Sequence, residues 1–152
     1  MQTSAHWRDF HRLPFRIYGD DPHWVPPLLL ERRLHFTPKH NSYFDHARAS
    51  FWLAYRDGEA VGRISAQIDQ LHLERYQDGT GQFGFIEAID DADVFSQLLR
   101  TAEDWLRASG LSRACGPISF SMWDESGLLV EGFDTPPYVM MGHARPYYEG
   151  HI

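Results

Sequence analysis

The sequence predicts an α/β fold in which helices flank a mixed sheet. A β-hairpin pattern spans 49–69 around Asp57-Gly58, a dipeptide typical of tight hairpin turns. A further strand pattern at 83–89 is followed by a long amphipathic helix and then by a strand pattern at 113–119. A helical crossover makes these last two strands parallel if both lie in one sheet.

The chain begins with two predicted helices. Apolar residues at spacings of three and four, with arginines between them, predict a helix at 4–18. Pro14 lies inside this range and predicts a kink or a split into two short pieces. Pro26-Pro27 predicts the start of a second helix at 28–36, because proline is well tolerated in a first turn.

The central elements have clear local signals. The hairpin strands are predicted at 49–56 and 59–69, while the pattern at 71–80 is mixed. The long helix at 91–109 has an apolar stripe, acidic residues at its start and Gly110 immediately after its end. Beyond residue 120 the pattern weakens, and the last eight residues predict a helix that begins and is cut off.

Length and composition predict a single soluble domain. Its 152 residues are 43% hydrophobic and 23% charged, and no apolar run approaches the ~20 residues that span a bilayer. The lone Cys115 excludes an intrachain disulfide framework and fits a reducing compartment. We therefore expect a cytoplasmic protein without membrane partners, built of N-terminal helices and loops (1–47), the central elements (48–120) and a turn-rich end (121–152).

Charge is unevenly distributed along the chain. The formal net charge is −7, from 14 basic and 21 acidic residues. Residues 1–48 hold seven basic and five acidic side chains, whereas 49–152 hold seven and sixteen. Binding to a nucleic-acid backbone needs a basic face, so the acidic excess argues against nucleic acid and favours a cationic or amine-bearing ligand.

The order of these elements resembles the GNAT superfamily of acyl-CoA-dependent N-acyltransferases. The hairpin Phe51–Ile64, with Val-Gly-Arg-Ile after its turn, is similar to that family's second and third strands, and the later elements continue in the family's order. Three segments, 21–28, 83–87 and 127–137, resemble an uncharacterised bacterial branch of GNAT-like proteins. The resemblance covers nearly the whole chain.

The resemblance implies acyl transfer from acetyl-CoA or another acyl-CoA to an amine. It makes Glu87, near the end of the strand predicted at 83–89, the expected base for the acceptor amine. The alternative is a strand carboxylate that faces solvent or pairs with an arginine. It makes Tyr148 the expected acid toward the leaving thiolate, with packing or plain exposure as the alternative. Members with this fold carry two more strands after the final helix, and we expect those strands to be missing here.

One junction departs from the family pattern. Acyl-CoA-binding members have a glycine-rich segment between the strand that corresponds to 83–89 and the long helix after it. Backbone N–H groups of that segment face the pyrophosphate. Here residues 88–93 have no glycine and contain Asp90, Asp91 and Asp93. We expect these carboxylates to repel the cofactor, so an alternative function is a non-catalytic module. The unfinished sheet predicts self-association or pairing with a second GNAT-like domain.

Other residue groups suggest weaker chemistry. A cluster of acidic and aromatic side chains could bind an amine, although turn formation explains the acidic residues nearly as well. The residues of this cluster are Trp123, Asp124, Glu125 and Asp134. His35, His40 and His46 lack the spacing of a metal site, and we expect no metal. Cys115 is predicted as a small buried strand residue instead of a nucleophile.

Overall fold

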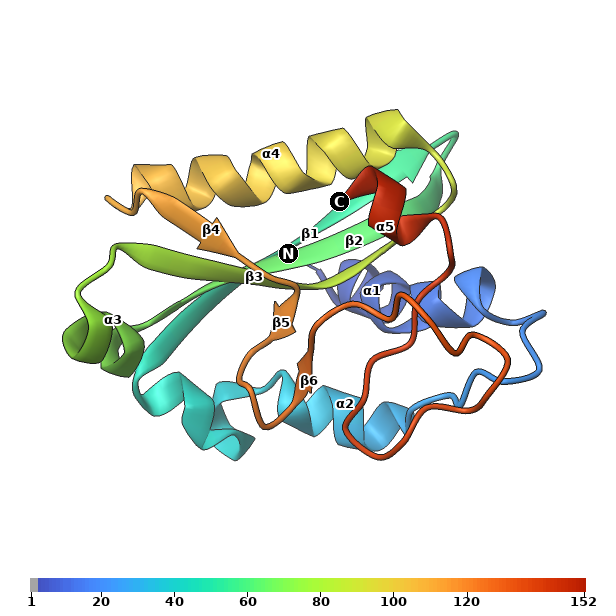
Figure 1. The fold of residues 1–152 in the computed structure, drawn as a ribbon, viewed down its shortest axis with the longest axis horizontal. Helices are drawn as coiled ribbons and strands as arrows, with labels where there is room; N and C mark the ends of the chain where they lie inside the picture. The colour runs from blue at the N-terminus through green and yellow to red at the C-terminus, as the bar shows by residue number, and fades with distance from the viewer. Residues whose placement is uncertain (1–2) are drawn as a thin grey trace.

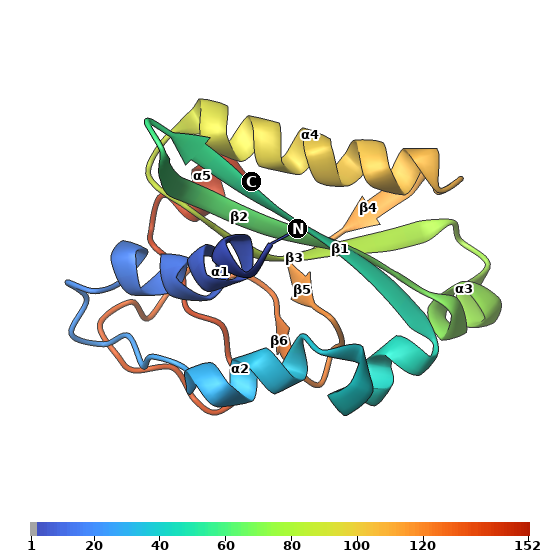
Figure 2. The ribbon, with the colours of Figure 1, turned by 180° about the vertical axis from the view of Figure 1, so that it is seen from behind.

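The computed structural model describes residues 3–152 and shows a four-stranded mixed sheet with helices on both faces (Figures 1 and 2). The sheet order is β1-β2-β3-β4, in which only the β3–β4 pair is parallel. A separate antiparallel pair, β5–β6, lies below the main sheet in Figure 1. In chain order the helices and strands are α1 (Ser4–Ile17), α2 (Leu29–His35), β1 (Ala47–Arg56), β2 (Glu59–Asp69), α3 (Gln70–Tyr76), β3 (Thr80–Ala88), α4 (Ala92–Ala108), β4 (Arg113–Cys115), β5 (Ile118–Ser119), β6 (Glu125–Ser126) and α5 (Tyr148–His151).

The structure confirms the predicted hairpin and crossover. Asp57 and Gly58 have φ angles of 51° and 83°, as the tight turn between β1 and β2 requires. Helix α4 connects β3 to the parallel strand β4 and packs on β2 through its apolar stripe. Gly62 on β2 allows this close approach, because a Cβ there would lie 2.8 Å from Leu98. Among residues 3–152, no helix is long and apolar enough to cross a membrane.

Helix α1 runs through Pro14 as one helix, so the predicted split into two short pieces does not occur. Proline has no N–H group, so the carbonyl of Phe10, four residues earlier, loses its helical partner. The Arg63 guanidinium of β2 supplies a replacement, because its Nη1 donates to the Phe10 oxygen at 2.6 Å. The helix therefore continues because a side chain from the sheet satisfies the carbonyl that proline leaves open.

The predicted strand at 113–119 is wrong in one respect, because it is two strands in two sheets. Strand β4 pairs with β3, and β5 pairs with β6. Between them lies Gly116-Pro117, and Pro117 has no N–H to donate to a strand neighbour. Strand β4 is a short, exposed edge, so Cys115 is exposed instead of buried as predicted.

The mixed pattern at 71–80 contains a short helix, α3, that the sequence analysis did not predict. The Asp69 carboxylate accepts from the backbone N–H groups of Leu71 and His72, which satisfies the first donors of the helix. Gln77 ends the helix in the left-handed region, at φ 50°. The Asp69 cap at its start and the left-handed Gln77 at its end therefore define a helix whose apolar pattern is weak.

Many of the aromatic residues form a second core between α1, α2 and the sheet. Phe36 lies at its centre, with its ring centroid 4.6 Å from that of Phe85 and 5.3 Å from that of Phe120. Aromatic pairs at such distances add stabilisation beyond the area that they bury. The buried members of this core are Phe10, Phe36, Tyr43, Phe51, Phe85 and Phe120.

The close approach of β5 to β3 predicts a sensitivity to substitution at Gly84. A Cβ at Gly84 would lie 2.1 Å from the carbonyl oxygen of Ile118, so the backbone itself would have to move. We expect Gly84→Ala to lower the free energy of unfolding by about 3 kcal/mol, the upper end for overpacking. Urea titration monitored by circular dichroism measures this. Gly150→Ala, where a Cβ meets nothing within 4 Å, is the control, and equal stability of the two variants would contradict the prediction.

Candidate functional site

Glu87 lies in an ion pair with Arg63, directly across the β2–β3 ladder. Arg63 Nε donates to one carboxylate oxygen at 2.5 Å and Nη2 donates to the other at 3.1 Å. The side chains are only 9% and 13% exposed. Of the two alternatives to a catalytic base, the structure shows pairing with an arginine, and both carboxylate oxygens already accept a charge-assisted hydrogen bond.

Two small cavities border Glu87, with volumes of about 70 and 40 Å³. Glu125 and His143 line both cavities, and Tyr148 lines the smaller one. Glu125 is itself paired with Arg32 of α2. We call these two adjoining cavities together the Glu87 pocket. Three sequence-predicted residues line it: Glu87, Glu125 and Tyr148.

Tyr148 is 1% exposed and holds the beginning of α5 against β3. Its hydroxyl oxygen accepts from the Ala88 N–H at 3.1 Å and from the Tyr18 hydroxyl at 3.1 Å. Burial raises the pKa of Tyr148 well above its ordinary value, and the charge of Glu87 raises it further. The hydroxyl therefore stays protonated at neutral pH, and packing dominates its surroundings.

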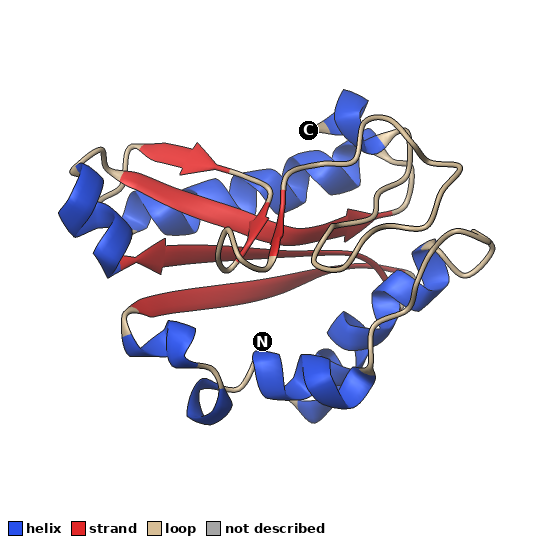
Figure 3. Cartoon of the chain, turned by 60° about the horizontal axis from the view of Figure 1, so that its bottom comes forward, coloured by secondary structure: helices blue, strands red, loops and turns tan. Residues whose placement is uncertain are grey.

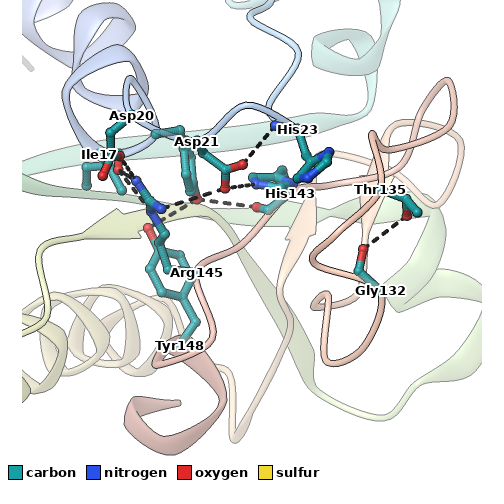
Figure 4. A network of polar contacts seen from close by, with 10 residues as sticks. Ile17, Asp20, Asp21, His23, Gly132, Thr135, His143, Arg145 and Tyr148 are labelled. Carbon is teal, nitrogen blue, oxygen red and sulfur yellow. Dashed lines mark hydrogen bonds and ion pairs between the residues drawn. The ribbon is translucent and has the colours of Figure 1, made fainter.

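His143 lines the Glu87 pocket and is paired with Asp21, a contact that no sequence pattern indicates; Figure 4 shows the pair. His143 Nε2 lies 2.9 Å from Asp21 Oδ2, and its side chain is only 4% exposed. The other ring nitrogen of His143, Nδ1, is buried and has no hydrogen-bond partner in the described part of the chain, residues 3–152. The two residues are 122 positions apart, so no local spacing could have linked them.

The environment of Asp21 favours its charged form. Burial acts to raise the pKa of this carboxyl group, but hydrogen bonds from His143 and from the His23 N–H, with the nearby Arg145 charge, bring the pKa below its ordinary value. The His23 N–H donates at 2.9 Å, and Arg145 Nη1 lies 3.7 Å away. An anionic Asp21 accepts a hydrogen bond from His143 Nε2, so Nδ1 is the ring nitrogen left for another group.

His143 also lines a larger cavity of about 380 Å³. It is formed by the loop at 126–143, which Figure 3 shows as a long irregular segment in front of the sheet. Apolar side chains dominate its lining, among them Leu128, Leu129, Val130, Pro136 and Met141. An apolar cavity with a few polar groups in its lining is the usual form of a small-molecule site.

The other predicted amine-binding residues are not gathered at this site. Trp123 and Asp124 line a different cleft, of about 760 Å³, where Asp124 accepts from the Ser121 hydroxyl at 2.7 Å. Asp134 is exposed in the 126–143 loop and does not line the Glu87 pocket. The structure therefore does not bring the four residues to one cavity, and of the four only Glu125 lines the Glu87 pocket.

The junction between β3 and α4 does not fit a pyrophosphate. The Asp91 carboxylate accepts from the backbone N–H groups of Asp93 and Val94, at 3.0 and 3.1 Å, and is paired with Arg56. Asp90 contacts His151 at 2.7 Å. The donors that would receive a phosphate are therefore taken by a side chain of the same sign. Within residues 3–152, no three His, Cys, Asp or Glu side chains are grouped to hold a metal ion.

Two curated proteins are similar to nearly the whole chain. It is 51% identical over 143 residues to "Protein YghO" of Escherichia coli. The aligned residues cover 94% of the chain and 36% of that protein. The chain is 51% identical over 151 residues to "Bacterial ceramide synthase" of Caulobacter vibrioides, and the aligned residues cover 99% of the chain and 39% of that protein. The chain thus spans less than two fifths of the length of these relatives. No family model and no solved structure matches it.

The buried ion pair predicts a large effect of removing one partner. We expect Arg63→Met to lower the free energy of unfolding by about 3–5 kcal/mol, because it leaves the Glu87 carboxylate and the Phe10 carbonyl unpaired in the interior. Arg107→Met breaks an exposed pair with Asp104 and should cost less than about 1 kcal/mol. Urea unfolding of both variants checks this, and similar midpoints would refute a structural role for the pair.

His11, which lines the Glu87 pocket, predicts a pH dependence of stability. Burial, and then the charge of Arg63, lower its pKa from 6.5 to about 4. Because the unfolded chain binds this proton more readily, stability should fall as the pH drops from about 6.5 to about 4, by at most about 1.4 kcal/mol per pH unit.

We expect His11→Phe to reduce this slope, since phenylalanine keeps the ring contacts with Trp7 and Phe36 but does not titrate. Denaturant midpoints measured across that pH range test the expectation. The exposed His40→Gln variant serves as control, and an unchanged slope in His11→Phe would assign the effect to other groups.

Proposed function

We propose that this chain acts as an N-acyltransferase of the GNAT type and binds the amine acceptor. The observation that carries the proposal is the 51% identity over 151 residues to a protein named as a ceramide synthase. A ceramide is an amide of a long-chain acyl group and a long-chain amino alcohol. Its synthesis is therefore N-acylation. The hairpin and the crossover resemble the GNAT superfamily, which implies the same reaction class.

The geometry supports an acceptor with an amine at one end and an apolar chain at the other. The 380 Å³ cavity suits an apolar chain, and its lining includes His143, which also borders the Glu87 pocket. Each Glu87 oxygen has a second lone pair beside the one that accepts from Arg63, so the carboxylate would also accept a hydrogen bond from the ammonium group of such an acceptor. The role of Glu87 as the base stays a prediction of the sequence resemblance.

The acyl donor in this proposal is an acyl-CoA. The β3–α4 junction is not proposed as its binding site, because Asp91 occupies the donors there. The same observation favours a second candidate function, a non-catalytic module that binds the acceptor for another domain or subunit. The short shared length is compatible with this alternative, since the chain spans 36% and 39% of its two relatives.

The purified chain should be mixed with palmitoyl-CoA or acetyl-CoA and dodecylamine, and the amide measured by mass spectrometry. We expect amide formation and a drop of at least tenfold in kcat/KM for Glu87→Gln, because the neutral amide no longer attracts the ammonium group. Asp104→Asn, at an exposed position on α4, is the control and should keep the wild-type rate.

Calorimetry with acetyl-CoA and with dodecylamine separates the two candidate functions. Binding of both ligands with amide formation supports the acyltransferase. Binding of the amine without binding of the acyl-CoA or turnover would favour the non-catalytic module. Binding of neither ligand would contradict both.

A further inference from the structure

We propose that His143, oriented by Asp21, is the proton acceptor of this site, placed where the apolar cavity meets the Glu87 pocket. The inference deepens the proposed function and rests on it for the identity of the proton donor, the ammonium group of the acceptor. The position and reactivity of the His143 ring can be tested without any acyl transfer.

The first support is the free nitrogen. The contact of 2.9 Å between His143 Nε2 and Asp21 Oδ2 places a proton on Nε2, because a carboxylate only accepts. Nδ1 is buried and has no hydrogen-bond partner among residues 3–152. A buried polar atom without a partner is uncommon in folded proteins and points to a ligand or a catalytic role.

The second support is the way in which the pair is held. Asp21 receives a further hydrogen bond from the His23 N–H at 2.9 Å, and the Tyr18 hydroxyl oxygen, which donates to Tyr148, lies 3.3 Å from the His143 carbonyl oxygen. Arg145 lies on the other side of Asp21 and donates to the carbonyl of Ile17 at 3.0 and 2.6 Å (Figure 4). The carboxylate is therefore held from two directions, and it in turn orients the imidazole, as the orienting group of a base does.

The third support is a comparison with the other titratable groups predicted at the pocket. Both oxygens of Glu87 accept from Arg63, and the Tyr148 oxygen accepts from the Ala88 N–H and the Tyr18 hydroxyl. Glu125 is paired with Arg32, whereas His143 Nδ1 is buried and has no donor or acceptor partner within residues 3–152. The roles then divide, because Glu87 attracts the ammonium group and His143 removes its proton.

The proton balance of this step is simple. The acceptor ammonium loses one N–H proton, whose bonding pair stays on nitrogen as the nucleophilic lone pair. His143 Nδ1 takes the proton and becomes part of an imidazolium, which the adjacent Asp21 carboxylate stabilises. No oxidant, metal or second reactant is needed.

An affinity label tests the position of Nδ1 directly. N-dodecyl bromoacetamide has an alkyl chain for the apolar cavity and an electrophilic carbon at its end. His143 Nδ1 would attack that carbon, so that a C–N bond forms, the C–Br bond breaks and bromide leaves. The exposed Cys115 thiol also reacts with such reagents, so the experiment uses the Cys115→Ser chain and its Asp21 variants.

We expect peptide mass spectrometry to find His143 alkylated at least tenfold faster than the exposed His40. Bromoacetamide without the chain should show no such preference, and excess dodecylamine should protect His143. Asp21→Asn should slow the labelling at least tenfold. Asp90→Asn, which alters the matched Asp90–His151 pair, should leave it unchanged.

Each outcome decides something. Labelling of His143 no faster than His40, or without dependence on the alkyl chain, would overturn the proposal, and this result needs no variant to fold. Selective labelling in a chain that forms no amide would support the dyad and count against the proposed function. Amide formation that survives His143→Gln at the wild-type rate would refute His143 as the proton acceptor while leaving the acyl transfer intact.

Discussion

The buried charge of Arg63 is the constraint on which the rest of the structure depends. A guanidinium at this depth needs partners on every side, because an unpaired buried ion is strongly destabilising. It finds them in Glu87 across the sheet and in the Phe10 carbonyl of α1, and its carbon Cζ lies 4.7 Å from the centre of the Phe10 ring. One side chain thus joins β2, β3 and α1.

The position of α1 in turn fixes the candidate site. Its C-terminal end and the following loop contribute Tyr18 and Asp21, which contact the carbonyl and the imidazole of His143. Arg145 ties the same loop to the irregular segment before α5. A segment with little secondary structure is therefore held by side-chain contacts to α1, and this arrangement creates both the apolar cavity and the polar part of its lining.

The acidic residues of the chain have mainly structural partners. Asp69 and Asp91 begin α3 and α4 by accepting from backbone N–H groups, and Asp124 accepts from Ser121. Carboxylates that look like ligand groups in sequence are thus used as helix caps and turn contacts. This use also makes the start of α4 unsuited to a pyrophosphate. The polar chemistry gathers instead at Glu87 and His143, deeper in the fold.

The sequence alone determined the hairpin at Asp57-Gly58, the limits of α4 and the parallel crossover, because turn geometry, helix capping and apolar periodicity act over a few residues. It also placed Glu87 near the end of its strand. Only the tertiary structure decided that Pro14 leaves α1 intact and that Asp21 meets His143. These outcomes depend on partners from distant segments, which become neighbours only when the whole core packs, so no local pattern could encode them.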